Sequence, residues 1–170
     1  MAKPYLLVVT GRPGAGKTTF ARELGHEICL PVISRDQIKE GYVHTFGKRH
    51  AELPDDTNRI ATELFFDIIM NMLNNNVSLI AEAAFQHAVW SSMLERCRGI
   101  ARTYVLICKV DDAVAHERFI RRGLENPSRE YFHGDRGVDL ARRGVEPGVS
   151  PYDEPRLDLP TIHTDTSGEY

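Results

Sequence analysis

Several features that mark large classes of proteins are missing from this sequence. Its 21 Lys and Arg residues are outnumbered by 24 Asp and Glu residues, which gives a net charge of −3. The basic surplus of a general nucleic-acid binder is therefore absent. No apolar run is long enough to cross a membrane, and the apolar segment 5–9 is too short for a signal peptide. We therefore expect a cytoplasmic protein that does not insert into membranes.

Cysteine is scarce and widely spaced. Cys29, Cys97 and Cys108 form no CxxC pair, and the seven histidines show neither an HExxH motif nor a Cys/His cluster. These spacings exclude the common zinc sites. An odd number of separated cysteines predicts reduced thiols, which we expect to be buried in the core.

What remains is the composition of an ordinary globular protein. The 170 residues are 42% hydrophobic and 26% charged. That is enough apolar material to bury a core, and the length suits one domain. We expect residues 1–170 to form a single domain.

Strand-like and helix-like segments alternate along the chain, which is typical of an α/β fold with a mostly parallel sheet. Apolar residues repeated every three or four positions predict helices at 17–29, 36–43, 88–98 and 112–122. Short apolar runs predict strands at 5–10, 31–34, 77–83, 104–110 and 161–165. The run 104–110 has the character of a strand buried on both faces.

A longer helix is predicted between the aspartates at 55–56, either of which can cap it, and the asparagines at 74–76. Its buried stripe is predicted to consist of Ile60, Leu64, Ile68 and Met72. The polar segment 44–54 before it is predicted to be a mobile loop. Residues 123–150 have little apolar periodicity and predict a lid with its hinge, including a short helix near 135–143, and residues 147–160 show no clear element.

The segment from Gly11 to Thr18 matches the pattern GxxxxGK[ST]. Its glycines let backbone N–H groups wrap closely around phosphates, Lys17 can reach the β- and γ-phosphates, and the Thr18 hydroxyl can bind Mg²⁺. A glycine-rich turn without function is the alternative, but the predicted strand before it and helix after it are the context that the motif requires. We therefore expect ATP and Mg²⁺ to bind at Gly11, Arg12, Pro13, Gly14, Ala15, Gly16, Lys17, Thr18 and Thr19.

Two carboxylates follow predicted strands, where ligands of open α/β sheets gather. Asp36 comes just after the second strand and could accept the proton of an attacking hydroxyl; the alternative is a helix N-cap. Glu82 ends the third strand, where a charge is costly unless it meets a cation or a donor. It could contact the substrate or order Mg²⁺ through water, or it could be a paired structural carboxylate.

Arginines are concentrated before and within the predicted lid, at 118, 121, 122 and 129. Phosphoryl transfer spreads negative charge over the equatorial oxygens, and arginines that close over them stabilise that charge. Arg118 and Arg122 are four residues apart and share one helix face. The alternative for any one of them is a solvated basic surface.

The phosphate loop, the Ser34-Arg35-Asp36 element and the arginine-bearing lid together resemble the small P-loop kinases. The resemblance is to the group of zeta-toxin-like and polynucleotide-kinase-like proteins, which includes chloramphenicol phosphotransferase, and it extends from Tyr5 to about Asp165. It implies the P-loop NTPase fold, with a five-stranded parallel sheet in the order 2-3-1-4-5 and helices on both faces.

The resemblance also implies roles for single residues. The catalytic base falls on Asp36, and the lid arginines that bracket the phosphates fall on Arg118, Arg122 and Arg129. The basic residue three positions after the aspartate, which binds a substrate phosphate in polynucleotide kinases, falls on Lys39. Where those kinases have Asp-Thr-Asn after the third strand, this chain has Glu82-Ala83-Ala84, so polar contacts to a nucleic acid are missing there.

The sequence thus favours an ATP-dependent kinase that phosphorylates a hydroxyl of a small molecule, with substrate contacts from Asp36, Lys39 and Glu82. One alternative is a kinase for the 5′-hydroxyl of RNA or DNA, with an anion-binding rim of Lys39, Lys48, Arg49 and His50. A second alternative is an ATP-binding regulator that transfers nothing.

Overall fold

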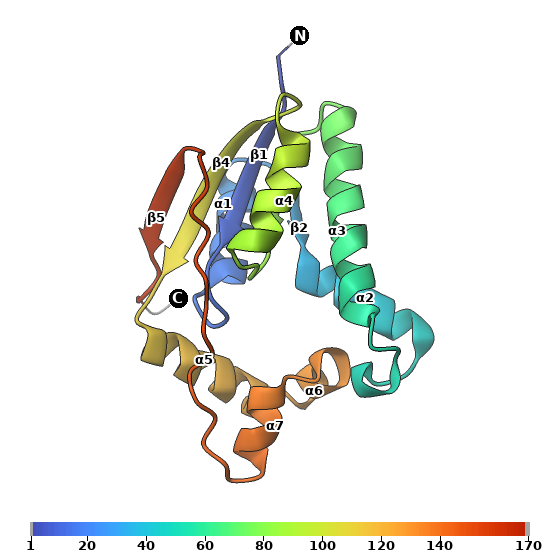
Figure 1. The fold of residues 1–170 in the computed structure, drawn as a ribbon, viewed down its shortest axis with the longest axis vertical. Coiled ribbons are helices and arrows are strands. Elements are labelled where there is room, and N and C mark those ends of the chain that lie inside the picture. Colours follow the sequence, from blue (N-terminus) through green and yellow to red (C-terminus); the bar gives the residue numbers. More distant parts are fainter. Residues whose placement is uncertain (1, 169–170) are drawn as a thin grey trace.

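The computed structural model describes residues 2–168, in which five parallel strands form one sheet in the order β2-β3-β1-β4-β5 (Figure 1). This confirms the α/β fold class and the strand order that the resemblance implied. The strands are β1 Tyr5–Thr10, β2 Val32–Ser34, β3 Leu79–Glu82, β4 Arg102–Lys109 and β5 Thr161–Asp165.

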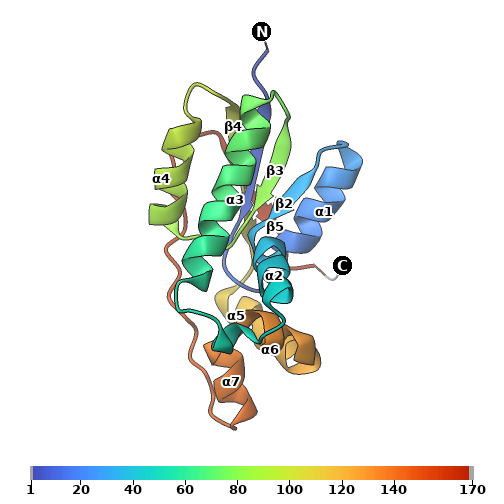
Figure 2. The same ribbon diagram turned by 90° about the vertical axis from the view of Figure 1, so that its right-hand side faces the viewer.

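Helices cover both faces of the sheet (Figure 2). On one face lies α1, and on the other α3 and α4, while α5, α6 and α7 form the lid below the carboxyl ends of the strands (Figure 1). The helices are α1 Lys17–Glu27, α2 Arg35–Phe46, α3 Thr57–Asn74, α4 His87–Cys97, α5 Asp112–Glu125, α6 Pro127–His133 and α7 Arg136–Arg142, with a 3₁₀ turn, η1, at His50–Glu52. None of the helices described is long and apolar enough to cross a bilayer.

The larger core lies between the sheet and the helices α3 and α4. Phe65 and Trp90 are fully buried there, and their rings meet edge to face at 6.2 Å. The indole N–H of Trp90 donates to the Thr10 hydroxyl over 2.9 Å, so the one polar atom of this ring is satisfied. The smaller core, which includes Val9 and Ala21, lies under α1. Both cores therefore hold β1, and with it the loop that follows, in place.

The buried stripe predicted for α3 is wrong by one residue. Leu64 and Ile68 are 40% and 38% exposed, whereas the residues that follow each predicted position are fully or almost fully buried: Ala61, Phe65, Ile69 and Leu73. One residue turns a helix by about 100°. Because apolar residues occupy adjacent positions in this helix, the apolar periodicity is compatible with either of two helix faces being buried. The packing of Phe65 against Trp90 determines which face is buried.

Other boundaries differ from the sequence predictions. The helix α2 continues to Phe46, and η1 follows it, so much of the predicted mobile loop 44–54 is helical. Within the lid, α6 was not predicted. The run 104–110 is not buried throughout, because Tyr104 in β4 is 38% exposed. Cys29 is exposed, while Cys97 and Cys108 are buried as predicted.

Candidate active site

The phosphate loop connects β1 to α1 and is held by close contacts with two neighbouring elements. Gly11 has φ 141° and Gly14 has φ 86°, values that only glycine adopts without strain. A Cβ atom on Gly11 would lie 2.6 Å from the Cys108 carbonyl oxygen, and one on Gly14 would lie 1.9 Å from the Ala115 carbonyl oxygen. The loop therefore packs against the end of β4 and the backbone of α5, which fixes its shape.

Lys17 is the first residue of α1 and is 7% exposed. Its ammonium group donates to the Arg12 carbonyl oxygen across the loop over 2.8 Å. Burial lowers the pKa of Lys17, and the nearby Glu82 and Asp36 carboxylates partly offset this effect. The side chain thus places a poorly solvated cation beside the positive end of a helix, which is the arrangement that binds phosphate.

A cleft of about 690 Å³ opens in front of the phosphate loop, and we call it the central cleft. It is bounded by the loop, the start of α2, the end of β3 and the lid helices α5 and α6. It brings together most of the site residues predicted from the sequence: Pro13, Gly14, Gly16, Lys17, Thr18, Thr19, Asp36, Lys39, Glu82, Arg122 and Arg129.

Asp36 lies in the first turn of α2, directly after β2, with its side chain 52% exposed. The N-cap of α2 is Ser34, so the alternative role of Asp36 as an N-cap is not borne out. Partial removal of Asp36 from water would by itself raise its pKa, but His133, Arg35 and the other cations nearby outweigh this effect and hold the pKa below its usual value. Asp36 is therefore an ionised carboxylate at neutral pH.

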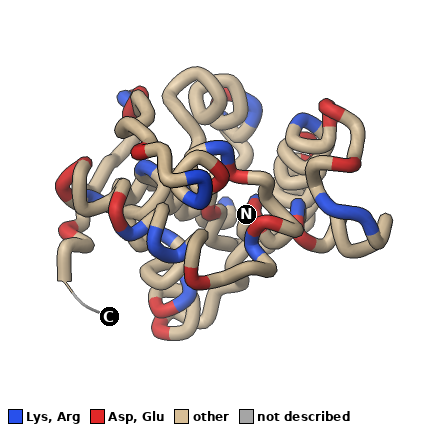
Figure 3. Tube along the Cα trace, turned by 90° about the horizontal axis from the view of Figure 1, so that it is seen from below, with Lys and Arg blue, Asp and Glu red and all other residues tan. Residues whose placement is uncertain are grey.

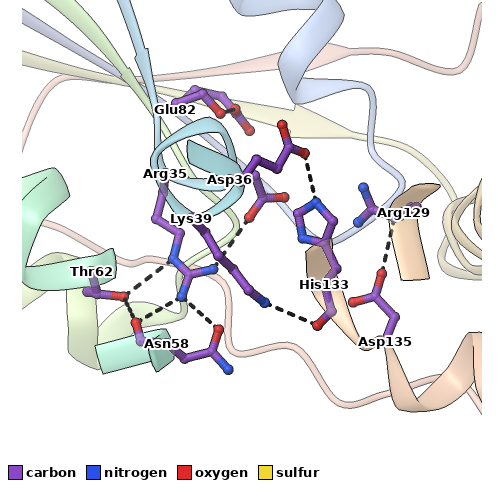
Figure 4. Close-up of polar contacts among 11 residues, drawn as sticks. Arg35, Asp36, Lys39, Asn58, Thr62, Glu82, Arg129, His133 and Asp135 are labelled. Carbon is purple, nitrogen blue, oxygen red and sulfur yellow. Dashed lines mark hydrogen bonds and ion pairs between the residues drawn. The ribbon is translucent and has the colours of Figure 1, made fainter. Parts of the chain in front are cut away.

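Arg35 positions the start of α2 and was not among the residues to which the sequence assigned a role. Its guanidinium donates to the Asn58 carbonyl and side-chain oxygens over 2.9 and 3.1 Å, and to the Thr62 hydroxyl over 3.4 Å (Figure 4). Its remaining nitrogen lies 3.5 Å from Asp36. Arg35 thus connects α3 to the carboxylate, and no sequence signal reveals this because Asn58 and Thr62 are distant in the chain.

Glu82 ends β3 and is 4% exposed. One of its oxygens accepts a hydrogen bond from the Ser34 hydroxyl over 2.7 Å. Burial raises the pKa of Glu82, while Lys17 and the hydroxyls of Ser34 and Thr18 act in the opposite direction. The carboxylate is thus paired with Ser34 and also lies beside Lys17 and Thr18, the groups expected to bind phosphate and metal.

The lid contacts α2 through a set of buried polar groups (Figure 4). Lys39, 4% exposed, donates to the carbonyl oxygen of His133 over 3.1 Å. The His133 ring, also buried, lies 2.8 Å from the Glu40 carboxylate. Burial, followed by Arg35, lowers the pKa of Lys39 to about 8. These contacts hold α6 beside the first turns of α2.

The predicted arginines take different positions. Arg122 and Arg129 line the central cleft; partial burial and then the neighbouring Arg129 lower the pKa of Arg122. Arg118 points to the segment after β5, where it donates to the carbonyl oxygens of Thr166, Ser167 and Gly168. It lines a separate groove beside Gly14 and Gly16, which Arg122 shares.

Three residues of the predicted nucleotide-binding segment lie outside the central cleft. Gly11 and Ala15 belong to the loop but are buried in it. Arg12 turns away, contacts Asp112 and donates to the Ser150 carbonyl oxygen over 2.9 Å. Among the described residues, no group of three or more His, Cys, Asp or Glu is placed to hold a metal ion by itself.

Comparison with known proteins gives this arrangement a family. A family model described as an AAA domain matches residues 6–144. A uridine kinase of Clostridium botulinum (strain Kyoto / Type A2) is 31% identical over 81 residues, which are 45% of this chain and 39% of that kinase. The chain thus matches well under half the length of this curated relative.

Solved structures share the fold over nearly the whole chain. A candidate kinase from Chloroflexus aurantiacus J-10-fl superposes with a TM-score of 0.72 at 23% identity, over 97% of this chain and 89% of that one. A chain of the Pnkp1/Rnl/Hen1 RNA repair complex superposes with a TM-score of 0.62 at 17% identity, over 93% and 51% of the two chains. The chain therefore belongs to the AAA domain family, and its fold is that of the P-loop kinases.

Proposed function

We propose that this protein is an ATP-dependent kinase that transfers the γ-phosphate to a hydroxyl of a small molecule. The observation that supports this most directly is the composition of the central cleft. A phosphate loop with its lysine and the ionised Asp36 line the same cleft, so that a donor and an acceptor can meet there.

The residues beside the loop fit a magnesium ion. Mg²⁺ takes oxygen ligands, and it is usually held by one or two protein groups together with substrate phosphates. Thr18 and Glu82 offer such oxygens next to each other, and Lys17 accompanies them. When bound, the ion would neutralise charge on the phosphates. Thr18 and Glu82 would hold it, directly or through water, and Lys17 would bind the β- and γ-phosphates.

Asp36 is assigned the role of the base. Its carboxylate would orient the acceptor hydroxyl and take its proton. The hydroxyl oxygen would then bond to the γ-phosphorus, while the bond from the γ-phosphorus to the β–γ bridging oxygen breaks and ADP is released. A base with a low pKa is weak, which suits a loose transition state in which the proton moves late. Arg122 and Arg129 would stabilise the charge on the transferred group.

The acceptor is proposed to be a small molecule rather than the end of a polynucleotide. Figure 3 shows Lys and Arg interspersed with Asp and Glu along the trace, rather than gathered in one basic stripe. The similarity to a uridine kinase supports a small acceptor, while the fold shared with a chain of an RNA repair complex keeps the polynucleotide alternative open. The cytoplasmic location stays a prediction.

Two substitutions test the proposal. We expect Lys17→Ala to weaken the binding of Mg·ATP and to lower turnover together, because Lys17 contacts the phosphates in both the ground and transition states. We expect Asp36→Asn to leave ATP affinity within about twofold and to lower turnover by roughly 10²-fold or more, the usual contribution of a positioned base. ATP affinity is measured by calorimetry, and turnover by mass spectrometry on a panel of hydroxyl compounds.

Lys3→Ala, a change at an exposed lysine just before β1, serves as the control and should alter neither quantity. Normal turnover by Asp36→Asn would remove the assignment of the base. Tight ATP binding with no phosphorylated product from any acceptor, and slow ATP hydrolysis that is indifferent to Asp36→Asn, would instead favour a non-catalytic regulator.

A further inference from the structure

The lid contains a second cavity, separate from the central cleft. It has a volume of about 370 Å³ and lies between α5, α6, α7 and the segment around η1, and we call it the lid cavity. Gly123 and Val138 contribute to its wall; a Cβ on Gly123 would lie 2.4 Å from the Val138 side chain. The lid helices are therefore tightly packed beside this space, and the space is built into the fold.

The lid cavity adjoins the central cleft through a shared wall. Four residues line both: Arg129, Gly134, Asp135 and Arg136. Arg129 Nε and Asp135 Oδ2 face each other at 3.1 Å (Figure 4), yet both atoms are buried and make no aligned hydrogen bond with any described residue. The ion pair thus forms part of the wall that the two spaces share.

The charges around the lid cavity are unequal. It is lined by five arginines and three carboxylates. Each carboxylate has an arginine partner, through the pairs Arg129–Asp135, Arg142–Glu130 and Arg143–Asp139. Arg49 and Arg136 are exposed and form no ion pair with any residue from 2 to 168. Two guanidinium groups are thus left to bind an anion, and arginine forks match phosphate oxygens well.

We propose that the lid cavity binds a phosphate group of the acceptor. The acceptor would then be a phosphorylated hydroxyl compound that extends from Asp36, past the Arg129–Asp135 pair, to Arg49 and Arg136. This inference rests on the proposed kinase function, since it uses Asp36 to place the reacting hydroxyl. The phosphate can come from a small sugar phosphate or from the end of a nucleotide chain, because the cavity would recognise the same group in each.

The test measures binding and needs no turnover. The protein is saturated with Mg²⁺ and a non-hydrolysable ATP analogue, so that the phosphate loop is filled, and is then titrated in a calorimeter. The probes are ribose 5-phosphate and the dinucleotide TpTp, each compared with the same compound without its terminal phosphate, ribose or TpT. We expect Arg49→Gln and Arg136→Gln each to weaken binding of a phosphorylated probe by about tenfold, as the loss of one charged hydrogen bond predicts.

Two further variants serve as a control and as an independent test of the lid cavity. Arg98→Gln makes the same change of charge at an exposed residue just after α4 and should leave probe binding unchanged. Ala51→Trp, at an exposed residue that lines the cavity, should fill it and prevent phosphorylated probes from binding while the ATP analogue still binds.

The probe that binds more tightly identifies the source of the phosphate. The inference is overturned if neither phosphorylated probe binds. It is also overturned if the probes bind the wild type and the variants Arg49→Gln, Arg136→Gln and Ala51→Trp equally. In either case the proposed kinase function stands. If the ATP analogue itself does not bind, the proposed function falls as well.

Discussion

Lys39 is a buried cation whose cost to stability can be measured. Its pKa in the folded protein is about 8, lowered from 10.5 by burial and then by Arg35. Between these two values the unfolded chain binds a proton that the folded protein does not. Stability therefore rises with pH across this window, and the contribution of Lys39 should grow by about 2 kcal/mol from pH 8 to pH 10.

Urea unfolding of the wild type and of Lys39→Met, compared at each pH, isolates this term. The Cys97 and Cys108 thiols, whose pKa values burial raises to about 11, are present in both proteins and cancel in the difference. Lys48→Met makes the same change at an exposed lysine and serves as the control for replacing lysine with methionine. A constant difference between the wild type and Lys39→Met would mean that Lys39 keeps its ordinary pKa.

Single residues also show which features of the site could be predicted from the sequence and which could not. The phosphate loop could be predicted because its glycines, lysine and threonine act over eight consecutive positions. Arg35 stands beside Asp36, yet its role depends on Asn58 and Thr62 of another helix. Arg12 belongs to the motif but faces Ser150, since the motif fixes the backbone of this position and not the direction of its side chain.

At the scale of elements, the phosphate loop depends on α5 as well as on its own sequence. We expect Gly14→Ala to lower ATP affinity by at least about tenfold and the free energy of unfolding by roughly 2–4 kcal/mol. The reason is a positive φ combined with a Cβ position 1.9 Å from the Ala115 carbonyl oxygen. Calorimetry with Mg·ATP and urea unfolding measure the two effects.

Gly47→Ala is the matched control for this substitution. Gly47 also has a positive φ, 61°, but a Cβ there would meet nothing within 4 Å. It should cost only the strain of the left-handed backbone, about 1–2 kcal/mol, with ATP affinity unchanged. Equal effects of Gly14→Ala and Gly47→Ala on ATP binding would show that contact with α5 is irrelevant to the loop.

The elements themselves were predicted with uneven success, for physical reasons. Strands and helices that pack on the sheet carry apolar periodicity, and all five strands were anticipated. The helix α6 has little periodicity because it is held by polar contacts to α2, such as the one from Lys39 to His133. The face of α3 was assigned wrongly because Leu64 and Phe65 are both apolar, and only the position of Trp90 distinguishes them.

At the scale of the whole molecule, two cores share one sheet, and residues 144–160 lead from the lid back to β5. The Asp153 carbonyl oxygen accepts a hydrogen bond from the His87 backbone N–H, and the Tyr152 hydroxyl donates to the Phe85 carbonyl oxygen. These bonds attach the segment to the start of α4. Arg12 attaches it to the phosphate loop. The connections join the lid, the loop and the main core, which supports the proposal that residues 1–170 form one domain.

If residues 1–170 form one domain that binds ATP, as proposed, the protein should unfold in a single transition that shifts when the nucleotide binds. The fluorescence of Trp90, the only tryptophan, reports on the main core, and far-ultraviolet circular dichroism reports on all the helices, including those of the lid. We expect the two signals to have the same midpoint. Mg·ATP at about 100 times its dissociation constant should add about 2.7 kcal/mol of stability, which raises Tm by roughly 5–10 °C. Lys17→Ala should lose this shift at the same ATP concentration, and two separate transitions in the wild type would show that the lid and the core are independent units.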